Sequence, residues 1–78
     1  MGETSDSKPS EQVIITNKGN SPITLVVEPW ADQSVILPGE RWVVTFLGAR
    51  GPIDVWHEPD RVLVFGLVGA TYEAVRTG

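Results

Sequence analysis

The chain contains no cysteine, and this absence removes two ways of holding a small fold together. There can be neither a disulfide framework nor a thiolate zinc site. The single histidine, His57, leaves too few nitrogen donors for a zinc or copper site, so a structural or partly exposed histidine is favoured over a ligand. We therefore expect no metal and no cofactor, and we expect packing, hydrogen bonds or self-association to stabilise the chain.

Long apolar runs are also missing. The longest, from Val62 to Ala70, contains two glycines and falls far short of the roughly 20 residues of a membrane-spanning helix. The segment from Met1 to Ser7 has no basic region followed by an apolar stretch, so it does not read as a secretory signal. We expect a cytoplasmic protein with no membrane partner.

Positive charge is scarce, with six Lys and Arg against ten Asp and Glu and a net charge of −4. Binding to a phosphate backbone depends on clustered Lys and Arg. The arginines are scattered singly along the sequence, at Arg41, Arg50, Arg61 and Arg76. We predict no nucleic-acid partner.

Short runs rich in Val, Ile, Thr and aromatic residues make up most of the chain, and no helical stripe is free of Pro or Gly. This pattern predicts an all-β fold, a small antiparallel β-sandwich or barrel of about six to seven short strands. Residues 1–11 are polar and aperiodic and predict a disordered tail, which leaves 12–78 as a single domain. The predicted strands are 12–16, 23–28, 34–37, 42–47, 53–58, 61–67 and 71–76.

The breaks between these runs have recognisable turn chemistry. Pro38-Gly39-Glu40 predicts a type II turn that folds two strands against each other, because Pro fixes the first corner and Gly accepts a positive φ at the second. The segment from Glu58 to Arg61 predicts a type I turn, and 17–22 predicts a polar hairpin loop. Gly66 and Gly69 indicate a bulge, or a bend where the strand leaves one layer for the next.

Alternation along the strands predicts which side chains face the core. The predicted inward sets are Ile23, Leu25 and Val27; Trp42, Val44 and Phe46; and Ile53, Val55 and His57. The run from Arg61 to Leu67 is apolar on both faces, which predicts a central strand or one covered by a partner chain.

The stretch from Ile15 to Leu25, followed by Val35 to Glu40, resembles a pattern common in small bacterial immunoglobulin-like β-sandwich domains. In those domains a strand ending in Asn-x-Gly leads through Pro and an apolar strand to a Pro-Gly-Glu turn. The match covers about half of the predicted domain. The segment Glu28-Pro29-Trp30 also looks like one found in small bacterial all-β proteins. These resemblances imply a sandwich fold and bring no catalytic or binding residues with them.

Tryptophan is abundant, with three residues in 78, and not all three can be central in so small a core. We expect Trp42 in the core, Trp56 on the outward face with Asp54 and Glu58, and Trp30 in a loop. Exposed aromatics mark interfaces and ligand platforms. In the alternative interpretation, Trp30 caps an end of the fold and Trp56 packs under a loop. The candidate binding residues are Trp30, Trp56, Asp54, Glu58 and Arg61.

We therefore predict a non-enzymatic protein-binding or assembly module whose main partner is its own copy. The alternative is a small-molecule or carbohydrate binder that uses the exposed tryptophans beside nearby carboxylates. An enzyme is a third hypothesis, because paired carboxylates support acid–base chemistry. The acids occupy strand ends, turns or outward positions, and there is no nucleophile motif or phosphate loop, so no catalytic residue is predicted.

Overall fold

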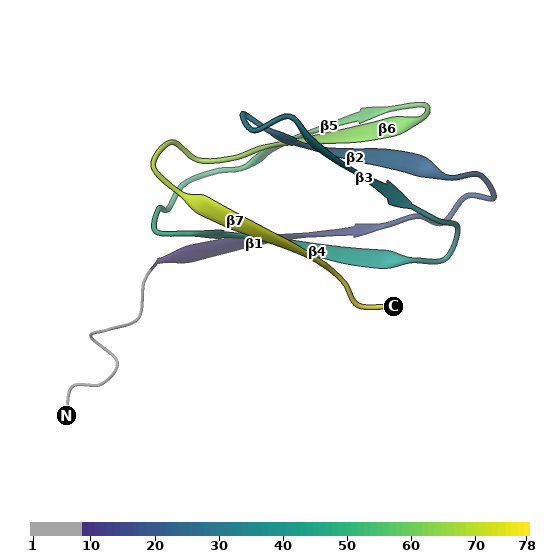
Figure 1. Cartoon of the computed structure of the whole chain (residues 1–78), viewed down its shortest axis with the longest axis horizontal. Coiled ribbons are helices and arrows are strands. Elements are labelled where there is room, and N and C mark those ends of the chain that lie inside the picture. The colour runs from purple at the N-terminus through teal and green to yellow at the C-terminus, as the bar shows by residue number, and fades with distance from the viewer. Residues whose placement is uncertain (1–8) are drawn as a thin grey trace.

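The computed structural model describes residues 9–78, which form seven strands and no helix. The strands make two sheets packed face to face, as Figure 1 shows. The prediction of an all-β sandwich is confirmed, and the sheets do not close into a barrel. The strands are β1 (Ser10–Thr16), β2 (Ile23–Glu28), β3 (Asp32–Ile36), β4 (Arg41–Leu47), β5 (Asp54–Glu58), β6 (Arg61–Phe65) and β7 (Thr71–Arg76).

One sheet has the strand order β1-β4-β7 and the other has the order β3-β2-β6-β5. Every neighbouring pair is antiparallel except β2 and β6, which run parallel from Thr24 opposite Arg61 to Glu28 opposite Phe65. The expectation of a wholly antiparallel fold is therefore wrong for this pair. The two strands are far apart in the sequence, and no hairpin between them dictates their relative direction.

The predicted strand boundaries are close to those observed, and β2 and β7 match residue for residue. The predicted tail is too long, because Ser10 and Glu11 belong to β1, where they pair with Leu47 and Phe46 of β4. Antiparallel partners on β4 extend the strand through these polar residues. Pro9 is described and lies just before β1, and residues 1–8 of the predicted tail lie outside the described residues.

The core lies between the two sheets. Its largest fully buried side chains come from both layers: Leu25, Ile36, Phe46, Val44 and Val64. The predicted inward sets of β2 and β4 lie on the core side, and β6 is central, between β2 and β5. On β5 the prediction is only partly right, because Val55 is half-buried and His57 is exposed. β5 is an outermost strand, so less of the facing sheet covers its far end.

The Pro38-Gly39 turn forms as predicted. The Glu40 N–H donates to the Leu37 carbonyl at 3.0 Å, and Gly39 has a φ of 85°. The Glu40 carboxylate accepts from the Leu37 N–H at 2.9 Å and from Arg76 at 3.0 Å, and these contacts lower the pKa of Glu40. However, the turn does not pair its flanking strands with each other, because β3 and β4 lie in different sheets.

The loop from Asn17 to Pro22 likewise carries the chain from one sheet to the other, so the prediction of a hairpin there is wrong. Hairpin pairing does occur at the Pro59-Asp60 turn, where Glu58 lies opposite Arg61. The segment containing Gly66 and Gly69 leads from β6 in one sheet to β7 in the other, as the predicted change of layer requires.

Asn17 links two of these connections by hydrogen bonds: the loop that follows β1 and the turn that follows β3. Its side chain is 4% exposed and donates to the carbonyl oxygens of Ser21 at 2.9 Å and Ile36 at 3.0 Å. Its Oδ1 accepts from the Gly19 N–H at 3.0 Å, and its backbone N–H donates to the Glu40 carbonyl at 3.0 Å. A single buried amide thus satisfies the polar groups where two loops meet.

Candidate interaction surface

The outer side of the four-stranded sheet brings apolar side chains into register across its strands. Trp56 of β5 lies opposite Leu63 of β6, and Leu63 lies opposite Val26 of β2. Phe65 and Val35 project from the same side by alternation along β6 and β3. We call this surface the Trp56 face, defined by the residues Val26, Val35, Trp56, Leu63 and Phe65.

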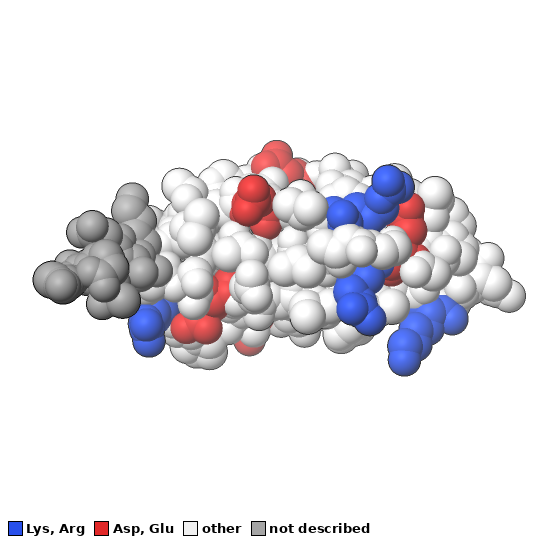
Figure 2. Space-filling model, turned by 90° about the horizontal axis from the view of Figure 1, so that it is seen from below, with Lys and Arg blue, Asp and Glu red and all other residues white. Residues whose placement is uncertain are grey.

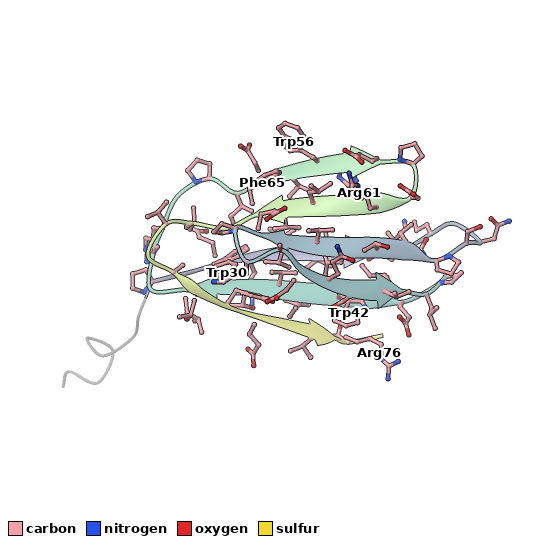
Figure 3. All side chains as sticks on the ribbon, turned by 45° about the horizontal axis from the view of Figure 1, so that its top comes forward. Trp30, Trp42, Trp56, Arg61, Phe65 and Arg76 are labelled. Atoms are coloured by element: carbon pink, nitrogen blue, oxygen red, sulfur yellow. The ribbon has the colours of Figure 1, made fainter. Side chains whose placement is uncertain are left out.

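Trp56 itself is 56% exposed. Its ring packs at a tilt of 51° against Phe65, with 5.3 Å between the ring centroids. Figure 3 shows Trp56 on the outer side of the sheet with Phe65 beside it. A large aromatic side chain held in place by a neighbour loses little conformational entropy when a partner covers it.

Charged groups lie at both ends of this face. The Arg61 Nε donates to Glu58 Oε1 at 2.7 Å, and this hydrogen bond raises the pKa of Arg61. Asp54 is exposed at the beginning of β5, opposite Phe65. Four of the five candidate binding residues, Trp56, Asp54, Glu58 and Arg61, therefore belong to one side of the molecule.

The fifth candidate, Trp30, lies apart from the other four. It follows Pro29 in the turn between β2 and β3. Its ring stacks on the ring of Phe46, with 6.2 Å between the ring centroids, and its centroid lies 4.7 Å from the ring centroid of Tyr72. Figure 3 shows it between the two sheets, away from Trp56. Although 38% exposed, Trp30 closes part of the core, as the capping interpretation predicts.

The two lateral sides of the sandwich differ. On one side, the Tyr72 hydroxyl of β7 donates a hydrogen bond to the Asp32 carboxylate of β3, which ties the outermost strands of the two sheets together. This hydrogen bond, together with burial, raises the pKa of Tyr72 to about 12. Trp30 packs against the same tyrosine, so this side is closed.

On the other side, a groove with a volume of about 540 Å³ separates β1 from β5. Val13, Ile15 and Val55 give it an apolar lining, with His57 and Lys18 also on its walls. A smaller cavity of about 310 Å³ lies at one end of the molecule and is lined by Glu28, Pro29, Phe65, Gly66 and Val68. Neither cavity is lined by Trp56.

The candidate binding residues did not include Val26, Val35, Leu63 or Phe65, although the apolar run that contains Leu63 and Phe65 was predicted to form a central strand or one covered by a partner chain. The signal was available for β6, because the two-residue turn at Pro59-Asp60 sets Glu58 opposite Arg61 and hence Trp56 opposite Leu63. The neighbour on the other side, β2, is parallel and distant in sequence, so no local signal identifies it.

Among residues 9–78, no three His, Asp or Glu side chains come together in a way that could hold a metal ion. Nor does any helix of the described chain have the length and apolar character needed to cross a membrane.

No protein-family model, curated protein or solved structure matches this chain. The resemblance to bacterial immunoglobulin-like domains therefore stays a prediction.

Proposed function

We propose that this chain is a non-enzymatic protein-binding module that self-associates through the Trp56 face. The observation that supports the proposal is the row of Trp56, Leu63 and Val26 across three strands on the outer side of the sheet, in which Trp56 is 56% exposed, Leu63 is half-buried and Val26 is 4% exposed. A sheet with one face in water normally alternates apolar and polar residues. From Val62 to Phe65, β6 is apolar on both faces. On the outer face Trp56 and Val35 are exposed and Leu63 and Phe65 are half-buried, and exposed apolar surface is typical of interfaces.

A second copy fits this face in one simple arrangement. With a two-fold axis along the strands, β6 of each copy lies over β2 of the other, and Leu63 meets Val26. Arg61 then lies over Thr24, which occupies the same row of the sheet. In the third row, Phe65 lies over Glu28. No charged side chain directly faces another of the same sign, which favours this pairing.

The alternative function, binding of a small molecule or carbohydrate, has less support from the geometry. Ligand sites are concave and bury most of their ligand. Trp56 lines neither the 540 Å³ groove nor the 310 Å³ cavity. A stacking platform without a surrounding hollow is better suited to a broad protein surface.

The proposal is tested with Trp56→Ala and sedimentation equilibrium over a wide concentration range. In the proposed arrangement Trp56 lies over Gln33 of the other copy and buries a large aromatic side chain there, so we expect the variant to weaken self-association by about 2 kcal/mol, roughly thirtyfold in Kd. Because Trp56 lies outside the core, the circular dichroism spectrum and cooperative thermal unfolding should be retained.

Leu37→Ala is the matched control, because Leu37 is 48% exposed and lies at the turn after β3, outside the Trp56 face. It should leave the association unchanged. A Trp56→Ala variant with wild-type association would contradict the proposal. An unfolded Trp56→Ala variant would show instead that Trp56 belongs to the core.

A further inference from the structure

Among residues 9–78, no strand pairs with the outer edge of β1, and this free edge is a second unpartnered feature, separate from the Trp56 face. β1 is the outermost strand of the three-stranded sheet. The Asn17 N–H donates to Glu40, and the Pro9 carbonyl accepts from Gly48, so the odd-numbered residues turn their backbone groups toward β4. Because these groups alternate along an antiparallel pair, Gln12, Ile14 and Thr16 present their N–H and C=O groups to the free edge.

This edge lacks the features that protect exposed strands from pairing. Edge strands are normally blocked by charged side chains, prolines or bulges. From Gln12 to Thr16, β1 has no charged residue and no proline, its pairing with β4 is continuous, and Ile14 is 60% exposed. β1 carries one charge, Glu11 near its beginning, and the other three outermost strands also carry charges: Asp54 and Glu58 at the ends of β5, Glu73 and Arg76 in β7, and Asp32 at the beginning of β3. The uncharged run from Gln12 to Thr16 is the part of β1 open to pairing.

The side chains beside the edge are also incompletely covered. Val13 and Ile15 point inward from β1 and line the 540 Å³ groove between β1 and β5. On the opposite lateral side the corresponding gap is bridged by Tyr72 and Asp32. A strand added next to β1 would bring further apolar side chains to the side of the sandwich that is open.

We propose that β1 pairs antiparallel with β1 of a second copy, with Ile14 opposite Ile14 across a two-fold axis. In this register Gln12 lies opposite Thr16. The Ile14–Ile14 pair and the Gln12–Thr16 pair are both hydrogen-bonded pairs, in which the two residues exchange N–H···O=C hydrogen bonds. All the edge groups of Gln12, Ile14 and Thr16 are satisfied. The two three-stranded sheets become one continuous sheet, and Val13 meets Ile15 on its inner face.

The same register is favourable in charge and in packing. Of the charged residues described on β1 and just beyond its end, Glu11 and Lys18 lie opposite Asn17 and Ser10, so neither faces a like charge. Glu58 lines the groove beside this edge. On the outer face, Ile14 already lies beside Val43 in a row that continues to Val75 of β7. Pairing extends that row across both copies. Figure 2 looks onto this side of the molecule, where groups of charged side chains are separated by uncharged surface.

The experiment exploits the position of Ile14 opposite its own copy. Ile14→Lys and Ile14→Glu are prepared separately, and their masses are measured by light scattering alone and as an equimolar mixture. Each variant alone sets like charges opposite each other, so edge pairing should weaken about tenfold or more. The mixture sets opposite charges together and should restore pairing, with the mixed dimer seen by native mass spectrometry.

Three results would overturn the inference: a wild-type chain that is monomeric at every concentration, single variants that associate like the wild type, or a mixture no more associated than its components. Amide hydrogen exchange of the wild-type chain provides a second readout that needs no substitution. The amides of Gln12, Ile14 and Thr16 should gain protection as concentration rises. Unchanged exchange at these amides in an associated sample would exclude edge pairing.

Edge pairing and the Trp56 face are separable in the same measurements. The Ile14 variants are also made on the Trp56→Ala background. If both surfaces associate, each single change should reduce the mass and the combination should give a monomer. If Trp56→Ala leaves the mass unchanged while the Ile14 variants reduce it, association through the Trp56 face is excluded and edge pairing is supported. If the Ile14 variants leave the mass unchanged while Trp56→Ala reduces it, edge pairing is excluded and the Trp56 face is supported.

Discussion

Gly66 lies so close beneath the indole of Trp30 that a Cβ atom on Gly66 would stand 2.7 Å from Cζ3 of Trp30. The same Cβ would lie 2.8 Å from Cε1 of Phe46 and 2.9 Å from the carbonyl oxygen of Glu28. The Gly66 N–H also donates to that carbonyl at 2.6 Å. The aromatic closure of the core therefore depends on the absence of a side chain at this position.

Gly66→Ala should destabilise the fold, because the added methyl group must displace two packed rings and a backbone oxygen. Overpacking of this kind costs about 1–3 kcal/mol. Urea unfolding followed by tryptophan fluorescence measures the loss as a lower midpoint with an unchanged slope.

Gly19→Ala is the control for Gly66→Ala. Its Cβ would meet only Asn17 Oδ1, at 3.4 Å, so its unfolding midpoint should change much less. Equal midpoints for the two variants would contradict the packing argument.

Asn17 provides a second test, because its buried amide donates two hydrogen bonds to backbone carbonyls. Asn17→Ala should cost about 1–3 kcal/mol of unfolding free energy, since the oxygens of Ser21 and Ile36 lose their donor. Asn17→Asp should cost more at neutral pH, because a carboxylate would face two carbonyl oxygens and has no proton to donate.

The pH dependence of the Asn17→Asp variant distinguishes a loss of packing from the loss of the two hydrogen bonds that the Asn17 amide donates. Burial beside carbonyl oxygens favours the protonated carboxyl, so the variant should regain stability relative to wild type as pH falls. Asn20→Asp, at an exposed position in the same loop, is the control and should have little effect. A deficit for Asn17→Asp that does not shrink with acidification would count against the hydrogen-bonding role.

Local signals predicted the strands well because each strand and turn has its own chemistry. The turn at Pro38-Gly39 could be identified from two residues, since Pro and Gly meet its φ requirements. That it joins two layers, rather than two paired strands, depends on the distant contact between Asn17 and Glu40. Alternation along a strand carries no information about such distant contacts. The order of the strands in the two sheets therefore could not be predicted from the sequence.

The candidate surface was predictable to a similar degree. Trp56, Glu58 and Arg61 share one hairpin, and the alternation of β5 with the Pro59-Asp60 turn puts them on one side. Trp30 was grouped with them because both tryptophans looked exposed in the sequence. Its real neighbours, Phe46 and Tyr72, come from strands of the opposite sheet.

Tyr72 and Asp32 make stability depend on alkaline pH. The Tyr72 hydroxyl keeps its proton in the folded state up to a pKa of about 12, against about 10 in an unfolded chain. A raised folded pKa means that this contribution is fully present below the unfolded value. As pH rises from about 10 through about 12, the unfolded state releases its proton first, so stability is lost across that window.

Because Tyr72 is the only tyrosine in the chain, its ionisation can be followed alone by ultraviolet difference absorbance near 295 nm. The folded protein should titrate well above the unfolded protein in urea. Asp32→Asn removes the carboxylate that accepts the hydrogen bond, and should move the Tyr72 pKa back toward its ordinary value. Tyr72→Phe should abolish the part of the alkaline stability loss that this group causes, while leaving the packing against Trp30 in place. If Tyr72 titrates at its ordinary pKa in the folded wild-type chain, the hydroxyl does not tie β7 to β3, and the closed side of the sandwich is held by aromatic packing alone.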